Sequence, residues 1–156
     1  MRRVTNINPE QRQKETLQKQ GGRQEGQGVR LLVDTHVVIW VSNVPSMIPR
    51  SVEHALKSPA NHVFVSAATP WEIALKVQSG KLQFDAAFLA DFDNRIRALA
   101  FEPLPMTAAH GVAAAALRGS HKDPFDRMLV AQSQVEQLTI ISKDPALAGL
   151  GAVVSW

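Results

Sequence analysis

The sequence of 156 residues contains no cysteine, no long apolar run and no apolar signal segment near its N-terminus. Without cysteine the chain has no disulfide, no thiolate nucleophile and no thiolate zinc site. No apolar run approaches the ~18 residues that a spanning helix needs, so the sequence predicts no transmembrane helix and no membrane partner. We expect a cytoplasmic protein, and the lack of cysteine fits a reducing compartment.

Basic charge is concentrated at the start of the chain. Residues 1–30 carry seven Lys/Arg and three Asp/Glu, a net charge of +4. Residues 31–156 carry ten Lys/Arg and eleven Asp/Glu, a net charge of −1. The nearly neutral body gives no support for a large basic face that binds nucleic acid. Residues 1–28 are rich in Gln, Gly, Lys and Arg and nearly free of large apolar residues, which predicts a disordered basic leader before one domain over residues 29–156. This leader is either a real basic arm or lies upstream of a native start at Val29.

From Leu31 onward, short apolar runs alternate with helical patterns. We expect strands at 31–34, 63–65, 101–104, 138–142 and 152–156. We expect helices at 36–42, 49–57, 69–79, 85–100, 107–117 and 124–137, with a helical turn from 145. This alternation predicts an α/β fold with three layers, α/β/α, in which a mostly parallel sheet of four to five strands lies between helices.

Four acidic residues stand at the joints of this pattern, namely Asp34, Glu72, Asp126 and Asp144. Asp34 and Asp144 follow apolar strands, and the other two lie at helix starts. Open α/β sheets bind their ligands outside the carboxyl ends of the strands. Carboxylates that converge there repel one another unless a cation holds them together, and Mg²⁺ or Mn²⁺ prefers oxygen ligands. The pattern therefore predicts a metal site.

Helix capping is the structural alternative for each acid. Thr69-Pro70-Trp71-Glu72 matches a capping box, while Asp123 and Asp144 each precede a proline as N-cap residues do. Asp34 is also placed to cap the following helix. On this alternative the chain is a non-catalytic α/β interaction module. Capping, however, does not require an acid directly after two buried strands, nor Asp126 when Asp123 already fills the cap.

The segments LLVDTHVVIW, SAATPWEIALKVQSGKL, HKDPFDRMLVAQS and IISKDPAL, in this order, resemble the PIN domain family. More closely they resemble the VapC-like ribonuclease toxins of type II toxin–antitoxin systems. The resemblance covers residues 30–156 and implies a metal-dependent endoribonuclease that uses Mg²⁺ (or Mn²⁺), a cognate antitoxin and a homodimer. It implies that the catalytic and metal-binding residues are Asp34, Glu72, Asp126 and Asp144. Related domains vary in substrate, so a nuclease that acts on another nucleic acid stays an alternative.

Several further residues accompany these motifs. The resemblance marks Asp123 as an auxiliary acid and Ser142 as a hydroxyl that contacts water or phosphate. Arg127 or Lys143 is a candidate for neutralising a neighbouring phosphate. The remaining candidates are expected in ordinary structural roles: His36 and His121 in hydrogen bonds, Trp40, Trp71 and Trp156 in the core or an interface, and the apolar helical stretches 48–56 and 71–77 in a dimer or antitoxin surface.

Overall fold

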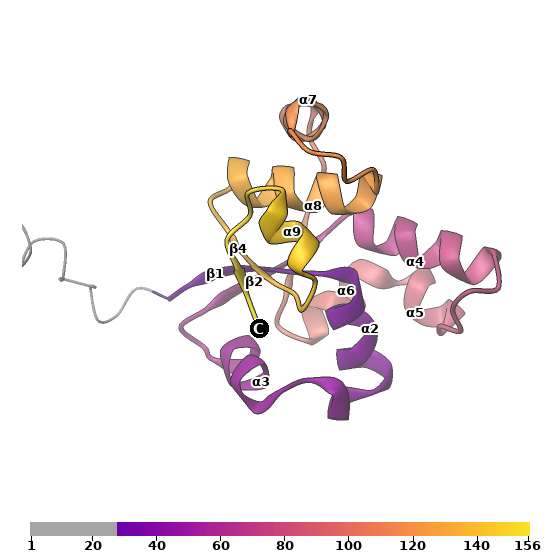
Figure 1. Ribbon diagram of the computed structural model, residues 1–156. Helices are drawn as coiled ribbons and strands as arrows, with labels where there is room; N and C mark the ends of the chain where they lie inside the picture. The colour runs from indigo at the N-terminus through magenta and orange to yellow at the C-terminus, as the bar shows by residue number, and fades with distance from the viewer. Residues whose placement is uncertain (1–27) are drawn as a thin grey trace, which may run out of the picture.

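The computed structural model describes residues 28–156, and a five-stranded, wholly parallel sheet runs through this part of the chain (Figure 1). The strand order is β3-β2-β1-β4-β5. The strands are β1 (Arg30–Val33), β2 (His62–Ser66), β3 (Glu102–Leu104), β4 (Thr139–Ile141) and β5 (Val154–Ser155). The disorder predicted for residues 1–28 falls, apart from Gly28, outside the described residues.

Helices make every crossover between these parallel strands, as parallel pairing requires. In residues 28–156 they are α2 (Thr35–Asn43), α3 (Arg50–Lys57), α4 (Ala68–Gln78), α5 (Ala86–Ala90), α6 (Phe92–Ala98), α7 (Ala108–Ala116), α8 (Pro124–Val135) and α9 (Pro145–Gly149), with one 3₁₀ turn, η1 (Pro45–Met47). This arrangement confirms the predicted α/β/α fold. Within the same residues no helix is long and apolar enough to cross a membrane.

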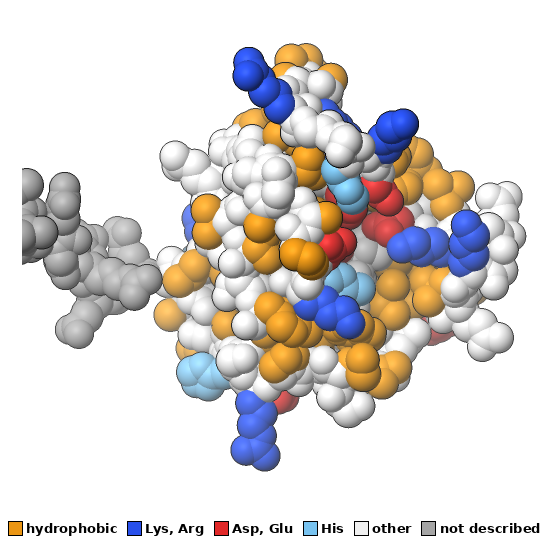
Figure 2. Space-filling model, in the orientation of Figure 1, with side chains coloured by type: hydrophobic (Ala, Val, Ile, Leu, Met, Phe, Trp, Pro, Cys, Tyr) orange, Lys and Arg blue, Asp and Glu red, His pale blue; other side chains and the backbone are white. Residues whose placement is uncertain are grey.

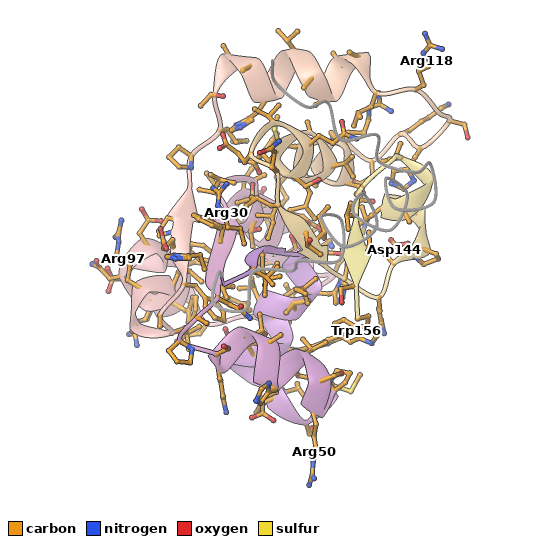
Figure 3. The ribbon with its side chains drawn as sticks, turned by 90° about the vertical axis from the view of Figure 1, so that its left-hand side faces the viewer. Arg30, Arg50, Arg97, Arg118, Asp144 and Trp156 are labelled. Carbon is orange, nitrogen blue, oxygen red and sulfur yellow. The ribbon has the colours of Figure 1, made fainter. Side chains whose placement is uncertain are left out.

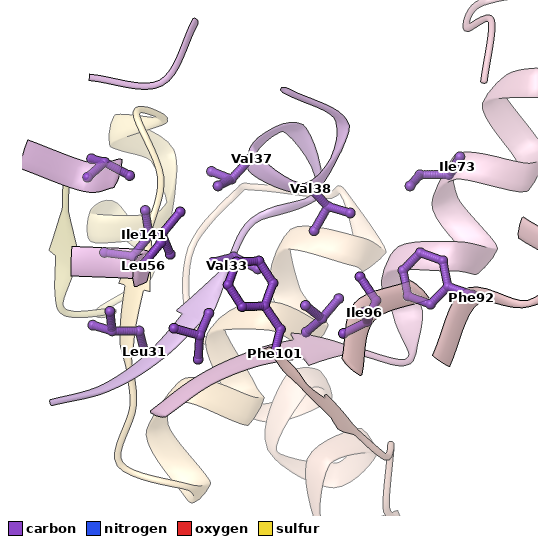
Figure 4. Close-up of a cluster of buried hydrophobic side chains, with 13 residues drawn as sticks. Leu31, Val33, Val37, Val38, Leu56, Ile73, Phe92, Ile96, Phe101 and Ile141 are labelled. Atoms are coloured by element: carbon purple, nitrogen blue, oxygen red, sulfur yellow. The ribbon is translucent and has the colours of Figure 1, made fainter. Parts of the chain in front are cut away.

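Two hydrophobic cores cover the two faces of the sheet. Successive strand side chains point to opposite faces, so Leu31 and Val33 of β1 belong to one core while Leu32 belongs to the other. The first core packs against α2, α3, α4 and α6 (Figure 4), and the second packs against α8 and α9. Leu32 is fully buried, and burying a side chain of this size contributes about 1.5–3 kcal/mol.

The prediction of a single helix over residues 85–100 is wrong, because the chain forms two short helices there. Asp91 separates them and has non-helical backbone angles, φ −125° and ψ 35°. Its carboxylate accepts a hydrogen bond from Asn94 Nδ2 at 2.6 Å, a local bond that competes with continuous helix. The break still allows Phe92 and Ile96 to enter the first core.

The direction in which successive strands are added to the sheet reverses at β1. From β1 the chain moves to β2 and β3 on one side, and then returns to β4 and β5 on the other. The amide of Asp34 donates to the carbonyl oxygen of Ile141 at 3.1 Å and so joins the carboxyl ends of β1 and β4. Such a switch point is where open α/β sheets bind ligands, and the predicted acidic residues lie around it.

Three arginines of this fold lie far from one another. Figure 3 shows that Arg50, Arg97 and Arg118 project from separate places on the surface.

Candidate active site

Asp34 is the most buried acid of the site and does not act as a helix cap. It occupies the N-cap position of α2 with extended backbone angles, yet its side chain accepts no capping hydrogen bond. Its Oδ2 instead accepts from the hydroxyl of Ser142 at 2.6 Å and lies 3.1 Å from His36 Nδ1. Burial opposes ionisation, but the hydrogen bond and charge of His36 and the Ser142 hydroxyl outweigh it and hold the pKa of Asp34 below its ordinary value.

Glu72 also fails to act as a cap, although its sequence matches a capping box. Helix α4 begins one residue before Thr69 and has no side-chain cap, so the capping-box alternative is wrong. The two carboxylate oxygens of Glu72 accept from the hydroxyl of Thr35 and from the ammonium of Lys76. Thr35 directly follows Asp34 in sequence, so this hydrogen bond ties α4 to the end of β1.

Asp126 lies in the first turn of α8, where Asp123 already fills the N-cap. The Asp123 carboxylate accepts from the amides of Phe125 at 2.8 Å and of Asp126 at 3.3 Å, which confirms the predicted cap. The Asp126 side chain is left to contact His121 Nε2 at 2.5 Å. Burial raises the pKa of Asp126, and repulsion from Asp123 and Asp34 adds to the rise against the opposing effect of His121. The carboxylate of Asp34 is therefore close enough to act on that of Asp126.

Asp144 differs from the other three predicted acids because its carboxylate caps a helix. Its Oδ1 accepts from the amide of Ala146 at 2.8 Å at the start of α9. Figure 3 shows Asp144 beside α9. Its link to the site runs through its backbone, because the amide of Asp144 donates to Ser142 Oγ at 3.0 Å. The hydroxyl of Ser142 thus stands between the Asp144 amide and the Asp34 carboxylate.

One crevice brings three of the four predicted acids together. Figure 2 shows the acidic side chains in a patch with histidines on two sides and Lys or Arg side chains around it. The crevice has a volume of ≈ 10 Å³, about the space that one water molecule fills. Its lining consists of Asp34, Thr35, Ser66, Ala68, Thr69, Glu72, Phe125, Asp126 and Leu129.

The donor atoms of this crevice fit a hard divalent cation in their chemistry. Among the described residues no three carboxylate or imidazole groups already stand as a complete metal cage. Mg²⁺ does not need one, because it is commonly held by one or two carboxylates together with water and substrate phosphate. Asp34 and Asp126 line the same crevice and repel each other, so a cation between them would relieve the repulsion.

Arg127 holds the loop before α8 and does not face the crevice as a free cation. Its guanidinium donates to the carbonyl oxygens of Ala114 at 3.2 Å, of His121 at 3.1 Å and of Leu117. These bonds use three of the five N–H donors of the guanidinium. Lys143 is the other predicted cation, and its Nζ lies 4.5 Å from the centroid of the Trp40 ring.

The partners of these acids could be predicted from the sequence only in small part. His36 and His121 make hydrogen bonds, as the sequence predicts, and in each case the partner is a predicted site carboxylate. His36 lies two residues after Asp34, a spacing that hints at the contact. Nothing in the sequence pairs His121 with Asp126 or Thr35 with Glu72, because these contacts depend on how loops and helices meet.

Comparison with known proteins identifies what this arrangement resembles. The family model described as "PIN domain" matches residues 31–152. Among solved structures, VapBC2 from Rickettsia felis, bound to a promoter DNA fragment, has a TM-score of 0.61 at 13% identity, with 81% of this chain and 98% of that chain covered. A toxin–antitoxin complex from Klebsiella pneumoniae has a TM-score of 0.53 at 18% identity, with coverages of 81% and 96%. FitAcB from Neisseria gonorrhoeae has a TM-score of 0.52 at 20% identity, with 80% of this chain and 95% of that chain covered. No curated protein matches the sequence.

Proposed function

The chain belongs to the PIN domain family, and we propose that it is a Mg²⁺-dependent endoribonuclease, the toxin of a toxin–antitoxin pair. The observation that carries the proposal is the gathering of Asp34, Glu72 and Asp126 in one crevice at the carboxyl end of the sheet. The toxin role is supported by fold, since similar solved structures are toxin–antitoxin proteins. We accordingly propose RNA as substrate, a cognate antitoxin as partner and a homodimer as the working form.

In this proposal Asp34 and Asp126 hold Mg²⁺, or Mn²⁺ in its place. When bound, the ion lowers the pKa of a water molecule and stabilises negative charge on the scissile phosphate. Ser142 keeps the Asp34 carboxylate oriented, and the low pKa of Asp34 keeps it ionised. His121 restrains the Asp126 carboxylate through the contact at its Nε2.

Glu72 is the residue best placed to move a proton. It lines the crevice and is held by the hydroxyl of Thr35 and the ammonium of Lys76. Glu72 accepts a proton from the water that attacks phosphorus in line. The new bond forms between the water oxygen and phosphorus as the bond from phosphorus to the 3′-oxygen breaks, and that oxygen takes a proton from solvent.

The remaining predicted residues take supporting roles. Asp144 acts on the site through its amide, which fixes Ser142, while its carboxylate caps α9. Asp123 caps α8 and thereby sets the direction of the turn that carries Asp126. Arg127 positions His121 through the carbonyl oxygen of that residue.

The test uses the purified full chain without a partner. We expect it to cleave single-stranded RNA with Mg²⁺ and to lose this activity in EDTA, while duplex DNA stays intact. Asp34→Asn and Asp126→Asn should each abolish the metal-dependent cleavage, and calorimetry should detect Mg²⁺ or Mn²⁺ binding to the wild type only. Cleavage of DNA alone would indicate a PIN nuclease with another substrate. An absence of ion uptake at millimolar concentration would contradict the metal site.

A further inference from the structure

An aromatic pair borders the acidic crevice on one side. Trp71 of α4 and Phe125 of α8 have ring centroids 4.8 Å apart at an interplanar angle of 68°. Each directly precedes a crevice acid in sequence, Glu72 and Asp126 respectively, and Phe125 is itself part of the crevice lining. The pair therefore continues the wall of the crevice outward to the surface.

Trp71 is unusually accessible for so large an apolar side chain. It is 53% exposed, whereas tryptophan is on average highly buried. Its edge-to-face contact with Phe125 fixes the indole from one side, and two side-chain torsions give it little freedom to lose on binding. A rigid and exposed aromatic ring beside a catalytic crevice is the type of surface on which an unpaired nucleobase stacks.

We propose that Trp71 forms a stacking subsite for one unpaired base of the substrate, next to the scissile phosphate. The inference rests on the proposed nuclease function and adds a determinant of substrate choice to it. Continuity between Phe125 and the crevice places the ring pair within reach of a strand whose phosphate lies at Asp34 and Asp126.

A protein partner is the competing occupant of this surface. Leu75 lies one helical turn after Trp71 and is 42% exposed, so both side chains would contribute to an apolar protein interface. A base, by contrast, stacks on the ring alone, and the leucine has no planar face to offer. A flat aromatic ring that shares a wall with the acids favours the base, and Leu75 provides a matched control.

The experiment combines protein variants with altered RNA. Cleavage of a short single-stranded RNA and of its analogues, each with one abasic position, is measured for wild type, Trp71→Ala, Trp71→Phe and Leu75→Ala. We expect Trp71→Ala to lower kcat/KM about 5- to 150-fold, the range for one base–aromatic stack. Trp71→Phe should keep most of the activity and Leu75→Ala all of it. For the wild type, one abasic position should lower kcat/KM by a similar factor. Trp71→Ala should cleave the same analogue with the kcat/KM that it has for intact RNA.

Binding provides a second measurement that does not need turnover. Titration with the same RNA in EDTA should quench the tryptophan fluorescence of the wild type. This quenching should be weaker in Trp71→Phe, and weaker with the RNA analogue that lacks the base stacked on Trp71. Equal losses in Trp71→Ala and Leu75→Ala, or abasic effects that persist in Trp71→Ala, would overturn the stacking subsite. A wild type that binds RNA with this pattern but does not cleave it would refute the proposed reaction and leave the subsite supported.

Discussion

Ser142 Oγ donates a 2.6 Å hydrogen bond to Asp34 Oδ2 across 108 positions of sequence. Both residues are buried, and each directly follows a strand, β4 and β1 respectively. The same hydroxyl oxygen accepts from the amide of Asp144 at 3.0 Å, so its proton is directed toward the carboxylate. Ser142 therefore supports the ionised form of Asp34 and fixes its orientation.

Replacing this hydroxyl should affect both stability and cleavage. Ser142→Ala leaves the Asp144 amide without a partner and leaves His36 as the remaining side-chain partner of Asp34 Oδ2. The change should lower the free energy of unfolding by about 1–3 kcal/mol. RNA cleavage should fall roughly 10- to 100-fold, the effect of losing a group that orients a metal ligand. Urea unfolding and cleavage kinetics measure the two effects.

A second buried serine gives the control for this change. Ser133 is 3% exposed and donates to Val130 at 2.8 Å within α8, away from the crevice. Ser133→Ala should alter stability without slowing cleavage, and Ser142→Thr should retain most activity because it keeps the hydroxyl. If Ser142→Ala cleaved RNA as fast as the wild type, the hydroxyl would have no role in positioning Asp34.

The capping geometry of Asp144 predicts that its charge is dispensable. Asparagine caps helices as well as aspartate does, so Asp144→Asn should keep both the stability of the protein and its RNA cleavage. Asp144→Ala should cost about 1 kcal/mol of unfolding free energy, measured in urea. Asp34→Asn should by comparison lose at least roughly 100-fold in metal-dependent cleavage. Equal losses in the two Asn variants would place the Asp144 carboxylate in the metal shell, as the sequence predicted.

Much of this fold could be predicted because its strands are short, apolar and separated by helical patterns. The run that ends at Asp34 reads as a buried strand, and the rule for the carboxyl ends of parallel strands then groups the acids. The break at Asp91 could not be predicted in this way. Apolar residues such as Phe88, Phe92 and Ile96 keep a helical spacing across it, and only the local bond between Asp91 and Asn94 marks the interruption.

The sequence singled out three acids that line one crevice, Asp34, Glu72 and Asp126, but it did not predict the partners of their carboxylates. Glu72 matches a capping box in sequence, yet α4 starts earlier and presents that carboxylate to Thr35. The contact between His121 and Asp126 depends on the loop conformation that Arg127 stabilises from the next helix. Contacts of this kind are set by tertiary packing, which no local pattern encodes.

The three carbonyl contacts of Arg127 predict a role in loop stability. Arg127→Lys keeps the charge but loses the fork of donors, so the loop over residues 117–123 should open more readily. We expect faster amide hydrogen exchange in that loop, a loss of about 1–3 kcal/mol in unfolding free energy and weaker RNA cleavage through the displaced His121. Arg118→Lys is the matched control, because Arg118 is exposed in the same loop. Unchanged exchange in Arg127→Lys would show that the loop holds without the guanidinium.

The pKa of Asp126 predicts that this residue trades stability for function. Because its folded-state pKa is raised above the ordinary value of 3.8, the folded protein binds more protons than the unfolded chain between the two values. Stability contributed by the protonated form is therefore lost as pH rises through the raised pKa, and near neutral pH the ionised carboxylate costs folding free energy. Asp126→Asn should unfold at a higher temperature than wild type in EDTA near neutral pH, although it cannot cleave RNA.

Asp34 should behave in the opposite way, which makes it the contrast for this measurement. Its pKa is lowered, so its ionised form stabilises the folded protein above the ordinary carboxyl range, and that stability is lost as pH falls through the lowered value. Asp34→Asn should lower the unfolding temperature in EDTA where Asp126→Asn raises it. Saturating Mg²⁺ should raise the unfolding temperature of the wild type and of neither variant. If the unfolding temperatures of both variants shifted in the same direction in EDTA, the two carboxylates would not differ in their effect on stability. The conclusion that ionised Asp34 stabilises the fold and ionised Asp126 destabilises it would then be wrong.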